Sequence, residues 1–199
     1  LSRLGVELHD FVVVRDEPDA MRTAFSKAAS MCDAVITSGG VSVGEADYTK
    51  QIMRELGDVS FWKIAMRPGR PMAFGSIKGE NHQAVLFGLP GNPVAVMVTF
   101  YQFVRNALLS MSGATDVAPL VMQAKTVEAI RKRPGRTEFQ RGVLSTDATG
   151  TRTVRITGAQ GSGVLRSMSE ADCFIVLEHD QDQIKAGDTV GVVLFEGLV

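Results

Sequence analysis

The sequence has few cysteines and no excess of charge of either sign. Its two cysteines, Cys32 and Cys173, lie far apart and outside any metal-like spacing. A disulfide framework is therefore not expected, and a reducing, cytoplasmic compartment fits best. The 21 Lys+Arg nearly balance the 22 Asp+Glu, which argues against a general nucleic-acid binder because such proteins usually carry a basic excess.

Long apolar runs are missing too. No run approaches the roughly 20 residues of a membrane-spanning helix, and no signal-peptide pattern is present, so no membrane partner is expected. With 45% hydrophobic and 22% charged residues, the chain can build a packed core, which excludes disorder as its main state. The chain starts at Leu1 in what reads as a helix tail, so we expect a fragment of a longer protein that lacks its first strand.

The first half of the chain alternates between strand and helix patterns. Residues 8–15, 33–37 and 59–66 are predicted strands, residues 72–88 a hairpin, and helices are expected from Pro18, over about 47–56 and over 94–111. Pro18 suits a first helical turn, and Gly57 suits a helix end. This alternation is typical of a layered α/β sheet with helices on both faces.

The second half has a different texture. Strand patterns recur without a convincing helix, over residues 118–130, 138–145, 152–157, 173–178 and 189–195. Turn sequences such as 147–150 and 185–188 separate some of these strands. The pattern predicts a small all-β barrel or sandwich, with the domain boundary near residues 112–118.

Three loops precede predicted helices, two of them directly after a predicted strand, where open α/β sheets usually bind ligands. They span residues 15–18, 37–47 and 89–93, and helix N-termini there would attract anions. In the second loop glycines allow close approach and serines add hydroxyl donors: Ser38, Gly39, Gly40, Ser42 and Gly44. The loop matches neither a Walker A motif nor a dinucleotide motif. It favours a phosphate or another oxyanion, although Gly-Gly also suits a plain tight turn.

Cations follow the third predicted strand. Arg67 and Arg70 flank a turn stiffened by prolines and suit a doubly charged anion. Lys63 interrupts an apolar strand and could aim its ammonium into a cleft. A solvated basic turn and a lysine that reaches to water are the plainer interpretations.

Two acids lie beside the predicted anion loops. Asp16 and Asp47 each stand near a helix start, where capping is one interpretation. A pair of acids facing one anion pocket would instead suggest Mg²⁺, which takes a few carboxylates together with ligand oxygens. The three histidines form no cluster in the sequence and are given no role.

Several long motifs resemble one known family. They are Ile36-Thr-Ser-Gly-Gly-Val-Ser-Val-Gly-Glu-Ala-Asp-Tyr48, Phe61-Trp-Lys-Ile-Ala-Met-Arg-Pro-Gly-Arg-Pro71, Gly88-Leu-Pro-Gly-Asn-Pro-Val94, Phe139-Gln-Arg-Gly142 and Gly158-Ala-Gln-Gly-Ser-Gly163. In this order they are similar to the molybdopterin molybdenumtransferases, the family of MoeA and the gephyrin E domain. The resemblance covers nearly the whole chain.

The resemblance implies a fold and an activity. The fold is a three-layer, MogA-like α/β domain with a mostly parallel sheet over residues 1–115, followed by a β-barrel domain over residues 118–199. The enzyme inserts molybdate into adenylated molybdopterin and releases AMP in a Mg²⁺-dependent step. The family acts as a homodimer whose sites are partly supplied by the partner, and we expect this fragment alone to be less stable and poorly active.

The resemblance also implies site residues. Positions at or near the family's active site are matched by Asp16, Asp47, Lys63, Arg67, Arg141 and Ser162. Asp16 and Asp47 would hold Mg²⁺, and Arg67 stands where the family often has lysine. The remaining expected ligand-binding residues lie in the anion-seeking loops: Ser38, Gly39, Gly40, Ser42, Gly44, Arg70, Pro90, Gly91 and Asn92.

Rival functions stay open at this point. A molybdopterin adenylyltransferase or a pyrophosphatase of the competence/damage-inducible type could use the same α/β domain, but both would lack the barrel half. A non-catalytic molybdopterin-binding or scaffold role is the other alternative, since gephyrin relatives also bind receptor segments.

Overall fold

The computed structural model describes residues 1–41 and 47–195, apart from the side chain of Asp47. The first part contains η1 (Ser2–Leu4), α1 (Pro18–Met31), β1 (Ala34–Ser38), α2 (Asp47–Leu56), β2 (Gly57–Lys63), β3 (Met66–Arg67), β4 (Pro71–Lys78), β5 (Gln83–Leu89), α3 (Pro93–Thr99), the π-helical η2 (Phe100–Val104) and α4 (Arg105–Met111). The second contains β6 (Met122–Thr126), β7 (Thr137–Thr146), β8 (Arg152–Ile156), α5 (Leu165–Ser169), β9 (Cys173–Leu177) and β10 (Thr189–Leu194).

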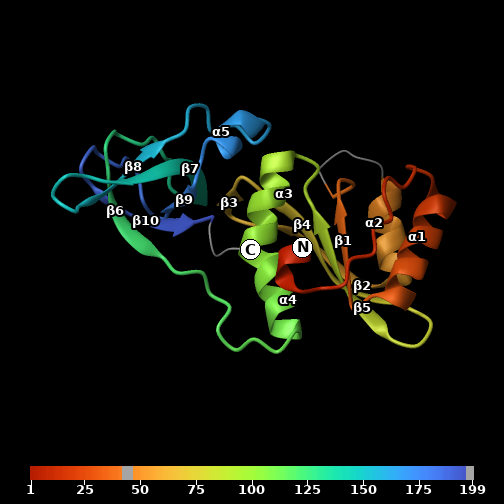
Figure 1. Cartoon of the computed structure of the whole chain (residues 1–199). Coiled ribbons are helices and arrows are strands. Elements are labelled where there is room, and N and C mark those ends of the chain that lie inside the picture. Colours follow the sequence, from red (N-terminus) through yellow and green to blue (C-terminus); the bar gives the residue numbers. More distant parts are fainter. Residues whose placement is uncertain (42–46, 196–199) are drawn as a thin grey trace.

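The first part is a three-layer α/β domain (Figure 1). Its sheet has the strand order β1-β5-β4-β2. Along β5, Ala84 and Leu86 join the apolar cluster under α1 and α2, whereas Phe87 and Leu89 join the cluster under α4. Because successive strand residues point to opposite faces, β5 contributes to the core on both sides of the sheet.

The sheet is mixed rather than mostly parallel. β1 pairs with β5 in parallel, but β5 with β4 and β4 with β2 are antiparallel. The reason is the hairpin of β4 and β5, whose short turn can only join antiparallel strands. The hairpin itself was predicted from the sequence; its effect on the whole sheet was not.

The predicted strand over residues 8–15 does not form. The N–H of Val12 donates a 2.7 Å hydrogen bond to Asp10 Oδ1, and φ of Val12 is +49°. This local side-chain turn competes with strand pairing. Val12 and Val13 are largely exposed, whereas Phe11 packs against the core beside α1 and α2, so only part of the apolar run reaches the core.

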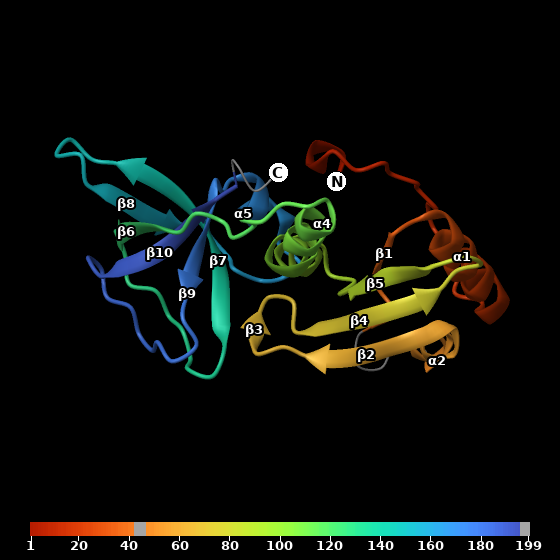
Figure 2. The same cartoon turned by 90° about the horizontal axis from the view of Figure 1, so that it is seen from below.

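The second part is a closed barrel (Figure 2). Its sheet runs β3-β7-β8-β6-β10-β9, and β9 pairs back to β7. The apolar interior includes Val154, Ile175, Leu177 and Val192. The predicted fold class, an α/β domain followed by a small barrel, is confirmed. Helix α5 was not predicted from the sequence. It has five residues, of which only Leu165 and Met168 are large and apolar, so it shows no helical periodicity.

The helix over residues 93–111 joins the two parts. Val94 and Val98 pack with Phe139 and Phe174 of the barrel, whereas Leu108 packs under the sheet. It is the one helix in the described ranges whose length, 19 residues, and mean hydropathy, 1.3, would allow it to span a membrane. In this fold the helix packs between the sheet and the barrel.

Gly57 and Gly75 allow the backbones of β2 and β4 to lie unusually close, and a substitution at Gly75 tests this. A Cβ added at Gly75 would lie 2.0 Å from the carbonyl oxygen of Asp58. Because that obstacle is backbone, Gly75→Ala should lower the free energy of unfolding by about 2–3 kcal/mol. Urea unfolding followed by Trp62, the single tryptophan and a β2 residue, measures it.

The neighbouring substitution Ser76→Ala is the matched control and should change stability by less than about 0.5 kcal/mol. Equal stability of the Gly75→Ala variant and the unmodified chain would show that the strands are not held this closely.

Candidate anion-binding site

One edge of the sheet collects most of the predicted site residues. β1, β5 and β2 run in the same direction, because β1 is parallel to β5 and β2 is two antiparallel steps from β5. Their carboxyl ends, Ser38, Leu89 and Lys63, therefore lie at a common edge. Arg70 precedes β4 at this edge, which is where open α/β sheets bind ligands.

The glycine loop and the loop before α3 touch each other. Gly39 N–H donates to the carbonyl of Leu89 at 3.1 Å, and a Cβ at Gly91 would lie only 3.5 Å from Gly39 Cα. Gly39 and Gly40 have φ of +91° and +69°, a region that favours glycine. A Cβ at Gly40 would also strike the side chain of Thr49 at 2.7 Å. Conformation favours glycine at Gly39, and both conformation and space favour it at Gly40.

A barrel loop reaches the same place. Asn92, the residue before α3, donates from Nδ2 to Ser162 Oγ at 3.0 Å. Pro90, Gly91 and Asn92 belong to the α/β domain and Ser162 to the barrel, so this contact joins two predicted binding segments across the domain junction. The open end of the 93–111 helix lies beside it, and free N–H groups at such an end attract anions.

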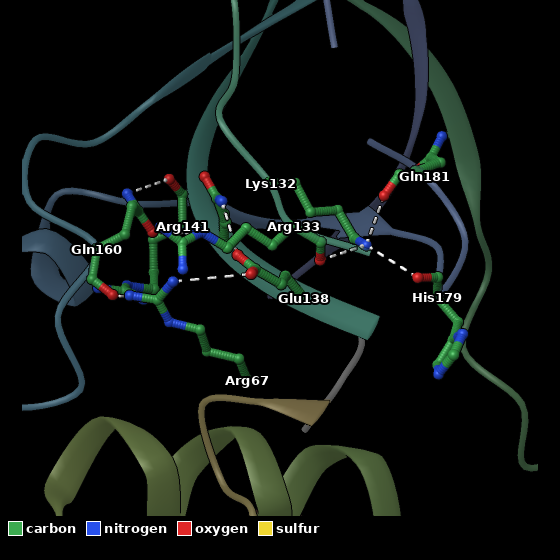
Figure 3. Close-up of polar contacts among 9 residues, drawn as sticks. Arg67, Lys132, Arg133, Glu138, Arg141, Gln160, His179 and Gln181 are labelled. Atoms are coloured by element: carbon green, nitrogen blue, oxygen red, sulfur yellow. Dashed lines mark hydrogen bonds and ion pairs between the residues drawn. The ribbon is translucent and has the colours of Figure 1, made fainter. Parts of the chain in front are cut away.

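Arg141 is buried within the barrel and anchors this loop (Figure 3). It is 1% exposed. Its guanidinium donates from Nη1 to the carbonyl of Gln160 at 3.3 Å. Nη2 donates to the carbonyl of Gly161 at 3.1 Å, and both Nε and Nη2 lie within 3.1 Å of Ser167 Oγ. The side chain of Gln160 also contacts the backbone of Arg141, because its Oε1 accepts a hydrogen bond from Arg141 N–H at 2.8 Å.

Through these hydrogen bonds Arg141 holds the barrel loop that contains Ser162. Burial, and then the nearby guanidinium of Arg67, lower the pKa of Arg141. Its donors meet carbonyl and hydroxyl oxygens rather than a carboxylate, so its positive charge adds to the anion-attracting character of the junction. Direct contact between Arg141 and a ligand stays a prediction.

The three predicted surface cations lie at the edge but differ in their contacts. Lys63 and Arg70 are exposed and lie at the two ends of a turn that the bond from Ile64 N–H to the Arg70 carbonyl closes at 2.8 Å. The Arg67 side chain is 57% exposed, and its Nη1 lies 3.7 Å from Glu138 Oε1. All three remain accessible to an anion.

The predicted acids are only partly described. Asp16 is exposed and shares with Ser38 and Gly39 the lining of a groove of about 1360 Å³. Asp47 begins α2, but its side chain, like Ser42 and Gly44, lies outside the described residues. Among the residues that the structure describes, no group of three or more His, Cys, Asp or Glu side chains could hold a metal ion. Two carboxylates with ligand phosphates would still suit Mg²⁺.

Sequence reasoning missed four polar residues around these groups. Glu138 and Gln140 are buried in β7, and Gln160 and Ser167 bind Arg141. A signal for the first two existed: polar residues two apart in a strand share one face. Gln160 and Ser167 gave no such signal, because their partner is distant in the sequence.

The fold defines a two-domain protein with a candidate anion-binding site at the junction of an α/β domain and a barrel. Residues 1–110 match the family described as "Probable molybdopterin binding domain", and residues 123–195 match "MoeA C-terminal region (domain IV)". The chain belongs to this MoeA family of molybdenum cofactor biosynthesis proteins. The second match also separates it from the rivals that would lack the barrel.

Curated relatives agree with this assignment. The chain is 41% identical over 200 residues to "Molybdopterin molybdenumtransferase" of Haemophilus influenzae, covering 100% of this chain and 48% of that protein. It is 34% identical over 196 residues to the protein of the same name from Staphylococcus aureus strain COL, covering 98% and 46%. The chain thus spans about half the length of the curated relatives it matches.

Solved structures share the fold. A molybdenum cofactor biosynthesis protein from Pyrococcus furiosus aligns with a TM-score of 0.70 and 28% identity, covering 93% of this chain and 57% of that chain. A molybdopterin biosynthesis moeA protein from Pyrococcus horikoshii aligns with a TM-score of 0.72 and 29% identity, covering 92% and 42%.

Proposed function

We propose that this chain is the substrate-binding part of a molybdopterin molybdenumtransferase. The reaction is insertion of molybdate into adenylated molybdopterin with release of AMP, in the cytoplasm and by a homodimer of the whole protein. The observation that carries the proposal is the meeting of three predicted binding segments at one sheet edge, namely Gly39–Gly40, Pro90–Asn92 and the loop of Ser162. Family membership supplies the pterin, which the geometry alone does not specify.

Different residues along this edge would bind different parts of the substrate. Backbone N–H groups of the glycine loop and of the 93–111 helix start would bind phosphate oxygens. Lys63, Arg67 and Arg70 would balance the negative charge of the adenylate and molybdate. Ser162 and Asn92 would hold the barrel loop over the ligand.

The proposal includes a magnesium ion held by Asp16 and Asp47. Bound Mg²⁺ would neutralise phosphate charge and so favour departure of AMP. The two carboxylates would supply the hard oxygen ligands that Mg²⁺ prefers, with the substrate phosphates completing its shell. The exposed position of Asp16 on the groove of Ser38 and Gly39 fits this role.

Substitution of Arg67 tests the edge. Arg67→Ala should weaken binding of adenylated molybdopterin about tenfold to hundredfold, because one charge-assisted hydrogen bond contributes about 1.5–3 kcal/mol. Arg67→Lys should retain most of the affinity if charge alone matters. Isothermal titration of both variants measures the effect.

Arg155→Ala is the control for this experiment, since Arg155 is exposed on β8, away from the sheet edge. Wild-type affinity and rate in the Arg67→Ala variant would make Arg67 a solvated turn residue and nothing more.

A further inference from the structure

Glu138 is a buried carboxylate at the domain junction to which the proposed reaction gives no task. It is 5% exposed, and a buried ionised carboxylate is unfavourable unless it is paired and hydrogen-bonded. Its place follows from strand pairing: β3 runs parallel to β7, and Arg67 is the register partner of Glu138. This pairing brings an α/β-domain arginine to a barrel acid.

Both carboxylate oxygens have partners (Figure 3). Glu138 Oε1 lies 3.7 Å from Arg67 Nη1, and Oε2 accepts a hydrogen bond from Gln140 Nε2 at 3.0 Å. Gln140 is itself buried, at 7% exposure. The carboxylate is therefore held from within the barrel, whereas its arginine partner reaches it from the exposed edge.

We propose that Glu138, oriented by Gln140, is a positioning residue that holds the Arg67 guanidinium at the anion-binding edge. The inference rests on the proposed function of that edge. An exposed arginine has several rotamers, and ordering it upon ligand binding is unfavourable. A fixed partner orders it beforehand, which raises affinity without a new ligand contact.

A purely electrostatic effect would have the opposite sign. Arg67 and Arg141 carry positive charge at the junction, and Glu138 carries negative charge. Removing the negative charge raises the net positive charge, so simple attraction would tighten anion binding. Positioning predicts weaker binding. The direction of the change therefore separates the two explanations.

The experiment is a double-mutant cycle in which isothermal titration measures the binding of inorganic pyrophosphate with Mg²⁺. Glu138→Gln should weaken binding about threefold to thirtyfold in the presence of Arg67 and should have no effect in the Arg67→Ala background. Glu80→Gln, on the exposed hairpin turn at the opposite end of β4 and β5, controls for loss of one negative charge.

Each outcome decides a different question. Tighter binding by Glu138→Gln, or an equal loss with and without Arg67, overturns the positioning role. Absence of pyrophosphate binding by the unmodified chain overturns the proposed edge function and this inference with it. If Glu138→Gln does not fold, Glu138→Asp replaces it, since it keeps the charge but draws the carboxylate back. Unchanged affinity of that variant would also contradict the proposal.

Discussion

Replacing Arg141 by methionine should lower the free energy of unfolding of the barrel by about 3–5 kcal/mol, because each buried oxygen that loses its donor costs about 1–3 kcal/mol. Methionine fills part of the volume but donates no hydrogen bond. The carbonyls of Gln160 and Gly161 and the hydroxyl of Ser167 would lose their donor, and buried polar groups without partners are expensive. Thermal and urea unfolding of the variant measure the loss.

Arg155→Met is the matched control, because the same change on exposed β8 should alter stability by less than about 0.5 kcal/mol. Arg141→Lys should recover only part of the loss, since one ammonium cannot replace the several donors of a planar guanidinium. A fully stable Arg141→Met variant with weakened ligand binding would contradict the loop-holding role and favour direct ligand contact.

Replacing Asp47 by asparagine should lower Mg²⁺-dependent AMP release roughly a hundredfold or more, within the range typical of directly acting groups. Asp47 begins α2, directly after the loop that follows β1, and the proposal has its carboxylate bind the metal. The amide is close in size but lacks the negative charge, so folding should persist. AMP release at several Mg²⁺ concentrations measures the effect, with thermal unfolding in parallel.

Capping of α2 is the competing explanation. In that case Asp47→Asn should leave turnover intact, and Asp47→Ala should lower stability by about 1 kcal/mol. Asp58→Asn is the control, because Asp58 is an exposed acid on the adjacent strand β2. Unchanged AMP release in the Asp47→Asn variant would remove the residue from the site.

Much of the fold could be predicted from local patterns. Apolar spacing predicted α1 and the 93–111 helix, and turn residues predicted the hairpin of β4 and β5 and the barrel strands. The segment over residues 8–15 failed because a strand needs a partner, and the Asp10 side chain turns its backbone instead. β3 had no signal, since two residues become a strand only by pairing with β7.

Local sequence patterns also predicted part of the candidate site. Strand ends and glycine placed the loops of Gly39 and Asn92 at one edge, because this follows from chain direction alone. The link from Asn92 to Ser162 and the position of Arg141 depend on packing between distant segments. The sequence shows that position 141 carries a positive charge. That loop carbonyls surround this side chain is visible only in the tertiary structure.

Molybdate-dependent AMP release tests the central claim most directly. The assay mixes adenylated molybdopterin and Mg²⁺ with the 199-residue chain and, separately, with the chain joined to the portion of the Haemophilus influenzae relative that lies outside the match. The account predicts AMP release by the joined protein that depends on molybdate and falls in the Arg67→Ala and Asp47→Asn variants. Substrate binding without molybdate-dependent AMP release, or release that neither substitution affects, would contradict it.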